Sequence, residues 1–104
     1  MKGFSDKNDP WNKLMMGLDS GTRFRVTKTM ILNSDKAFTK YALVKATGIK
    51  TRMVEDQLKN LLEIGWIKCF NITPKTYQIN MQNKTIRVLH SLFSEIKLLH
   101  KKSL

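Results

Sequence analysis

The chain has 104 residues, enough for one domain with a single modest core, and its 19 Lys and Arg against 8 Asp and Glu give a formal net charge of +11. This excess attracts a polyanion, which is either nucleic acid or an acidic membrane surface. The sequence excludes an internal disulfide or a zinc cluster of thiolates, because Cys69 is its one cysteine, and it excludes a membrane span, because no apolar run approaches about 18 residues.

Two helical patterns occupy the first third of the chain. Asp9 and Pro10 are typical of a helix start, since Asp caps free backbone amides and Pro has none to lose at the first helical position. Apolar residues at helical spacing then follow over residues 11–18. The segment over residues 22–33 suits a strand by its β-branched residues and a helix by its apolar spacing, and we interpret it as a helix.

A pair of helices separated by a glycine comes next. Thr39 is typical of a helix cap, and it starts a short helix predicted over residues 40–46. Gly48 permits the backbone angles of a tight turn at no side-chain cost. The second helix is predicted from Thr51 to about residue 64, with Gly65 suited to its C-terminal cap. One face of it carries charged residues, and the other is an apolar stripe of Val54, Leu58, Leu61 and Leu62.

The last third of the chain predicts a β-hairpin and a long helix. Two alternating runs, residues 66–72 and 75–80, meet near Pro74 and form a hairpin with a small basic tip. The helical pattern over residues 83–102 has an apolar face wider than one small domain is expected to cover. A second copy of the chain is the simplest cover, and a fold-back of the helix at residues 11–18 is the alternative; the two can occur together. The predicted dimer-interface residues are Ile86, Leu89, Leu92, Phe93, Ile96 and Leu99.

Several of these features occur together in one known family. They are the apolar segment RVTKTMIL, the residues Phe38 and Thr39 leading into YALVKA, the turn around Gly48, the helix that follows it, the closing segment EIGWIK, and the hairpin with Pro74 at its tip. As a set, residues 25–80 resemble the winged helix-turn-helix domain of small bacterial and archaeal transcription regulators. The resemblance implies a mainly α fold with a small β-hairpin and flanking helices. Its expected parts are an N-terminal tail and helix at 1–21, the winged domain at 22–82 and a dimerisation helix at 83–104.

Three positions depart from the pattern of that family. Lys50 stands where a small capping hydroxyl is usual, which leaves Thr51 as the candidate cap one residue later. Val44 occupies the place of a small residue in the preceding helix, where a larger side chain changes the helix crossing. Glu55 and Asp56 place acids on the exposed face of the second helix, where they repel phosphate.

The resemblance implies sequence-specific binding of double-stranded DNA by a small homodimeric transcription regulator. In such proteins the second helix of the pair enters the major groove, where Arg or Lys donates to guanine and Glu or Asp accepts from cytosine. Arg52 is the best candidate for reading a base. Lys40 is placed for a phosphate, and Lys68 and Lys75 on the hairpin for an adjacent backbone or minor groove. The complete set of predicted DNA-binding residues is Lys40, Lys50, Thr51, Arg52, Glu55, Lys59, Lys68 and Lys75.

Other interpretations of the same residues stay open. Lys50, Arg52 and Lys59 can form an ordinary solvated helix face. Winged helices also serve as protein-interaction modules, and the acids at positions 55 and 56 would suit a basic protein partner. The net charge alone suffices for an architectural protein that binds DNA without regard to sequence.

The sequence shows no constellation for catalysis, cofactor or metal. It has no nucleophile with a paired base and no glycine loop for phosphate, and His90 and His100 are too far apart on one helix to chelate a metal ion. Cys69 is expected to be a small apolar residue of a strand rather than a redox sensor. We therefore expect a protein that is not an enzyme and binds no cofactor. With no visible secretory signal, we also expect it inside the cell, in the cytoplasm or nucleoid, without a membrane partner. No effector ligand follows from the sequence.

Overall fold

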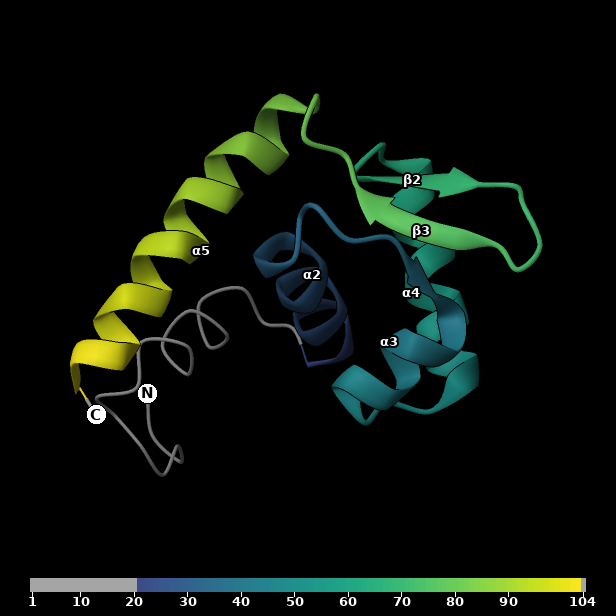
Figure 1. The fold of residues 1–104 in the computed structure, drawn as a ribbon, viewed down its shortest axis with the longest axis horizontal. Helices are drawn as coiled ribbons and strands as arrows, with labels where there is room; N and C mark the ends of the chain where they lie inside the picture. Colours follow the sequence, from purple (N-terminus) through teal and green to yellow (C-terminus); the bar gives the residue numbers. More distant parts are fainter. Residues whose placement is uncertain (1–20, 104) are drawn as a thin grey trace.

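Residues 21–103 are the part of the chain that this computed structural model describes, and they form four helices and a small antiparallel sheet (Figure 1). Along the chain the elements are α2 (Thr22–Leu32), β1 (Phe38–Thr39), α3 (Lys40–Thr47), α4 (Thr51–Glu63), β2 (Ile67–Phe70), β3 (Thr76–Ile79) and α5 (Lys84–Ser103). The predicted mainly α fold with a small β-hairpin is confirmed. The helix predicted over residues 11–18 lies outside the described residues.

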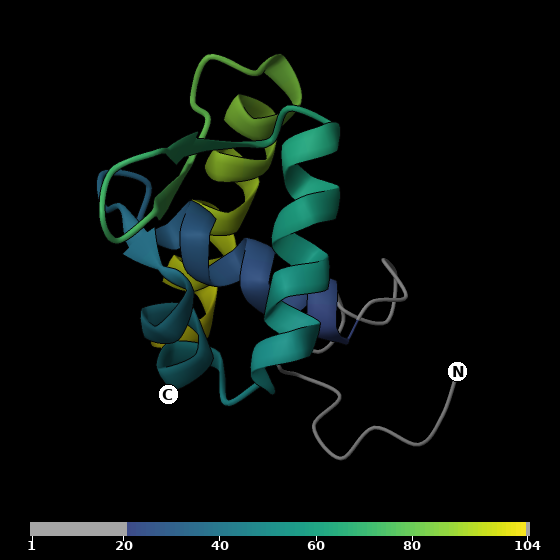
Figure 2. The ribbon, with the colours of Figure 1, turned by 90° about the vertical axis from the view of Figure 1, so that its right-hand side faces the viewer.

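Helix α2 lies at the centre of the fold. It contacts α3, α4, β3 and α5, and α5 lies on one side of it while α3 and α4 lie on the other (Figures 1 and 2). A helix covered on several sides needs a wide apolar face, and Phe24, Val26, Met30 and Ile31 are all buried. This wide face includes both Phe24 and Val26, whose spacing of two residues is also typical of a strand. Its interpretation as a helix is confirmed.

The sheet has three strands in the order β1-β3-β2, with both pairs antiparallel. The predicted hairpin is β2 and β3, in which Ile67 pairs with Ile79, although both strands are shorter than the predicted runs of residues 66–72 and 75–80. Strand β1 was not predicted. Its two residues are too few to show an alternating pattern, and Phe38 becomes a strand residue only by pairing with Tyr77, far along the chain.

The first half of α5 completes the core of the chain. Asn83 caps the helix, because its Oδ1 accepts the backbone N–H of Ile86 at 3.1 Å. Ile86 is 0% exposed and Phe93 is 1% exposed, and the ring of Phe93 packs on that of Phe24 in α2 with centroids 5.9 Å apart. The prediction of Ile86 and Phe93 as dimer-interface residues is therefore corrected: they are core residues of the chain itself. Leu89 and Ile96 are half-buried beside them.

Candidate nucleic-acid interface

The turn between α3 and α4 is held by two threonines at the ends of α3. Thr39 Oγ1 accepts the backbone N–H of Ala42 at 3.1 Å, so the predicted cap of α3 is confirmed. Thr47 Oγ1 donates to the carbonyl of Leu43 at 2.7 Å and accepts the N–H of Ile49 at 3.2 Å. The α4 helix therefore starts from a defined backbone position rather than from a loose loop.

Gly48 and Ile49 set the direction of the chain between the two helices. Gly48 has φ 72°, in the left-handed region that glycine adopts without strain, and its N–H donates to the carbonyl of Val44 at 2.9 Å. Ile49 follows as a buried residue of the core. Because one residue turns the chain and the next anchors it, α3 and α4 are joined tightly, as predicted for a helix-turn-helix.

The first turn of α4 has no side-chain cap. Lys50 occupies the cap position, with φ −61° and ψ 146°, and its side chain makes no capping hydrogen bond. A lysine side chain cannot cap the start of a helix, because its ammonium group has no hydrogen-bond acceptor for a backbone N–H. Thr51 is the first helical residue and not the cap, which corrects that prediction. The first-turn amides of α4 are therefore available to an acceptor from outside, such as a phosphate oxygen.

The two faces of α4 differ as the sequence predicts, with one exception. Val54, Leu58 and Leu61 are buried against the core, whereas Leu62 at the edge of the predicted stripe is exposed. The outer face is exposed over Arg52, Met53, Glu55, Asp56, Lys59 and Glu63. Together with exposed Lys50, this face carries three cations and three acids, so its formal charge is zero.

Lys40 and Glu55 form an ion pair across the two helices. The Nζ atom of Lys40, at the start of α3, lies 2.6 Å from Oε2 of Glu55 on α4. This hydrogen bond to the carboxylate raises the pKa of the Lys40 ammonium above its usual value, so Lys40 is cationic at neutral pH. The same ammonium lies 5.1 Å from the centre of the Tyr41 ring. Lys40 and Glu55, each predicted from the sequence to contact DNA, thus contact each other.

A small cavity joins the start of α3 to the tip of the hairpin. Its volume is about 170 Å³, and it is lined by Thr39, Lys40, Tyr41, Pro74, Lys75 and Tyr77. Burial raises the pKa of the Tyr77 phenol, so this hydroxyl keeps its proton and its ability to donate at neutral pH. Lys40 and Lys75, predicted to bind phosphate, are therefore neighbours. The sequence analysis missed Tyr41 and Tyr77. Tyr41 directly follows Lys40 in the chain, which is a signal that the sequence contained, whereas only the β1–β3 pairing brings Tyr77 to this place.

The β2–β3 hairpin, residues 67–79, carries apolar as well as basic side chains on its outer surface. Lys68 is exposed and pairs with Gln78 in the strand register. Phe70 is 41% exposed and Ile72 is 64% exposed, so the hairpin presents apolar surface beside its exposed lysines. The alternating pattern of the sequence contains the signal for this, because it places Phe70 and Ile72 on the same face as Lys68.

The elements that carry the predicted DNA-binding residues lie on one side of the molecule (Figure 2). In Figure 2, α4, α3 and the hairpin loop face the viewer, and α5 lies behind them. Lys50, Thr51 and Arg52 lie at the start of α4, and Lys59 lies further along the same helix. Sequence reasoning missed one support of this surface: the Nε of Arg23 in α2 donates to Oε1 of Gln57 in α4 at 2.9 Å.

Comparison with known proteins identifies the fold. The structure is similar to the homodimeric winged helix-turn-helix DNA-binding domain, fragment 1–100, of a possible ArsR-family transcriptional regulator from Mycobacterium bovis, with a TM-score of 0.56 and 20% sequence identity over 96% of this chain and 93% of that one. No protein-family model matches the sequence, and no curated protein matches it. The chain has the winged helix-turn-helix fold, as its sequence predicts.

Membrane-spanning helices and metal-binding clusters are both absent from residues 21–103. Within residues 21–103, no helix is both long enough and apolar enough to span a bilayer. The part of the chain that the structure describes also contains no group of three or more His, Cys, Asp or Glu residues placed to hold a metal ion. Cys69 is half-buried in β2, in register with Tyr77.

Proposed function

We propose that this protein binds double-stranded DNA in a sequence-specific manner and acts as a small dimeric transcription regulator. The observation that carries the proposal is the common placement of α4 and the hairpin on one side of the molecule (Figure 2). An α-helix fits the major groove, with its N-terminal residues against the base edges. The first turn of α4 begins at a tight turn, has no side-chain cap and carries exposed Arg52, with exposed Lys50 at the cap position before it.

The proposed roles of the residues follow their positions. Arg52 on the first turn of α4 donates to guanine, and Lys59 contacts the same groove further along the helix. Lys40 and Lys75 hold one backbone phosphate in the cavity that they share, with the hydroxyl of Tyr77 as an additional donor. Lys68 on the hairpin extends the contact to the adjacent backbone. The base contacts give the specificity, and the phosphate contacts set the register.

The proposed dimer forms through one side of α5. Val88 is 67% exposed and Leu92 is 42% exposed, and together with exposed Leu99 they form the α5 strip, flanked by half-buried Leu89 and Ile96. A second copy related by a two-fold axis would cover this strip on both chains. Because α5 lies on the opposite side from α4, such a dimer leaves both α4 helices free, as binding to major-groove turns about 34 Å apart requires. The similar domain from Mycobacterium bovis is homodimeric.

One observation favours a second candidate, a protein-interaction module. The exposed face of α4 has a formal charge of zero, and Phe70 and Ile72 expose apolar surface on the same hairpin that would follow DNA. A surface of this mixed composition also suits a protein partner. The formal net charge of +11 over the whole chain favours DNA over a protein as the partner.

Selection from a pool of random duplexes separates these functions. The purified chain is incubated with the pool at about 150 mM salt, where non-specific contacts are weakened, and the retained DNA is sequenced. Enrichment of a motif with two-fold symmetry is the expected result. Retention without a motif would indicate an architectural role, and absence of retention would favour the protein-interaction module.

A further inference from the structure

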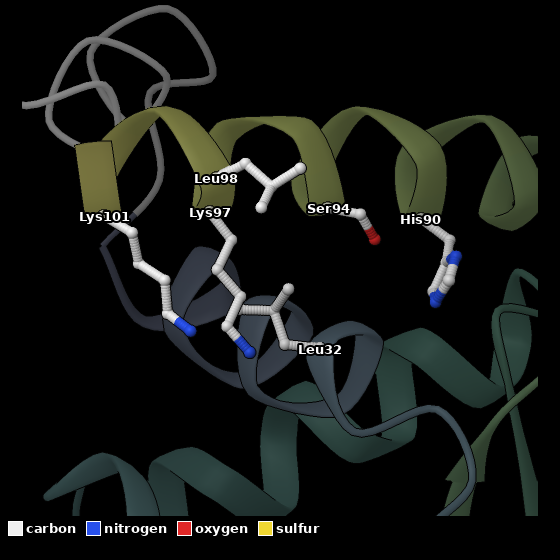
Figure 3. A pocket seen from close by; sticks show the side chains of 6 residues that line it. All are labelled: Leu32, His90, Ser94, Lys97, Leu98 and Lys101. Carbon is white, nitrogen blue, oxygen red and sulfur yellow. The ribbon is translucent and has the colours of Figure 1, made fainter. Parts of the chain in front are cut away.

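We infer that the cavity between α2 and α5 binds a small organic anion with an apolar body. This α2–α5 cavity has a volume of about 300 Å³ and is lined by Leu32, His90, Ser94, Lys97, Leu98 and Lys101. Figure 3 shows the side chains of His90, Lys97 and Lys101 reaching from α5 toward α2. The volume is at the lower end of the range for ligand pockets, so the ligand is a small molecule and not a polymer.

The two lysines in the lining of the cavity favour an anionic ligand. Lys97 and Lys101 are one helical turn apart on the same face of α5, a spacing at which like charges repel. Among residues 21–103, no acidic residue lines the cavity and neither lysine forms an ion pair with a carboxylate. A carboxylate or sulfonate between the two ammonium groups would remove the repulsion and accept a hydrogen bond from each.

The rest of the lining sets the chemistry of the ligand. Leu32 on α2 and Leu98 on α5 supply apolar surface, which favours a hydrocarbon or aromatic body over a bare inorganic ion. Ser94 adds a hydroxyl. His90 has its Nε2 atom 3.4 Å from Oγ of Ser34, which follows α2, so its ring is oriented at one end of the cavity. The combination is typical of a site for a short acid with an aliphatic or aromatic group.

This cavity is separate from both surfaces of the proposed function. At about 100° per residue, the middle of its α5 lining lies roughly 160° around the helix from the α5 strip of Val88, Leu92 and Leu99. A second copy bound to that strip would leave the cavity open. The α4 helix lies on the other side of α2 (Figure 1). The inference therefore does not depend on DNA binding or on the dimer.

Anilinonaphthalene sulfonate, a fluorescent organic anion, is the probe for this site. We expect saturable binding at one probe per chain, and a roughly tenfold weaker affinity in the double variant Lys97→Gln/Lys101→Gln, which loses both cationic donors. The matched control Lys84→Gln/Arg87→Gln removes the same charge from the first turn of α5 and should keep the wild-type affinity. Ser94→Phe fills the cavity without changing its charge and should abolish binding.

Competition tests the class of ligand. Octanoate should displace the probe, whereas octanol and inorganic phosphate at equal concentration should not, because each lacks one of the two required parts. Equal losses in the two double variants, or no saturable binding, would overturn the inference. So would loss of the signal in Leu92→Glu with retention in Lys97→Gln/Lys101→Gln, because the probe would then sit on the α5 strip. Circular dichroism of each variant shows that it is folded.

Discussion

The ammonium of Lys40 lies 2.6 Å from the carboxylate of Glu55, so the first residue of α3 is tied to the exposed face of α4. The pair places an acid next to a lysine that is expected to contact phosphate, and a phosphate must compete with that acid for the lysine. Both side chains are partly exposed, so we expect the pair to control DNA affinity more than folding stability.

Replacing Glu55 by Gln should strengthen binding to random duplex DNA. Lys40 would then be free to contact a phosphate, and the slope of log affinity against log salt should steepen by about one counterion. The measurement is binding to a random duplex between about 50 and 200 mM salt. Glu63→Gln is the control, because it removes the same charge from the last residue of α4. If both variants gain equally, net charge rather than the ion pair is responsible.

Arg52 and Lys75 should contribute differently to DNA binding, Arg52 to sequence specificity and Lys75 to affinity for any sequence. We expect Arg52→Ala to weaken binding to the selected motif by about 1 to 3 kcal/mol and to relax the base preference at one position, because Arg52 reads a base edge. Lys75→Ala should weaken binding to all sequences alike and reduce the salt slope by about one. Titrations of each variant with motif and random duplexes at several salt concentrations test this. Equal losses on both DNAs for both variants would contradict the assignment.

Charges on the α5 strip should separate the dimer. The double variant Val88→Glu/Leu92→Glu places two acids on the exposed apolar surface, and sedimentation equilibrium should show it as a folded monomer. Ser91→Glu adds an acid to an exposed position on another side of the same helix and should remain a dimer. A wild-type chain that sediments as a monomer at all concentrations would refute the proposed assembly.

Gly48 should resist substitution because of its backbone angle alone. A Cβ added there would meet nothing within 4 Å, but φ is 72°, so we expect Gly48→Ala to lower the free energy of unfolding by about 1 to 2 kcal/mol. Gly21→Ala is the control: it has equal space and φ −82°, which alanine adopts readily. Urea denaturation of both variants measures the difference. Equal stability of the two would show that the turn relaxes.

Replacement by valine should change the stability of the chain in opposite directions at two threonines. Thr27 is buried, and its hydroxyl has no hydrogen-bond partner among residues 21–103, so Thr27→Val should raise the free energy of unfolding by about 1 kcal/mol. The hydroxyl of Thr39 caps α3, so Thr39→Val should lower it by about 1 kcal/mol. Thermal unfolding of each variant, compared with that of the wild-type chain, measures the two changes in stability. A loss of stability in Thr27→Val would mean that its hydroxyl is satisfied.

Much of the candidate site could be predicted from the sequence because its geometry is local. Thr39 as a cap, Gly48 as a turn and the spacing of Val54, Leu58 and Leu61 act over a few residues, and the structure confirms all three. The position of the cap of α4 was wrong by one residue, since Lys50 occupies that place without a capping side chain. Helix boundaries are the least certain part of such a prediction.

Relationships between distant segments required the tertiary structure. The sequence by itself determined the four helices within residues 21–103, the hairpin and the basic character of the chain, because periodicity and charge belong to individual segments. Only the packing decided that Phe93 belongs to the core while Leu92 next to it is exposed, since an apolar helix face does not say which part of it a neighbour will cover. Packing also decided that Lys40 meets Glu55, because contacts between helices depend on how they cross, and the crossing is set by all the side chains between them.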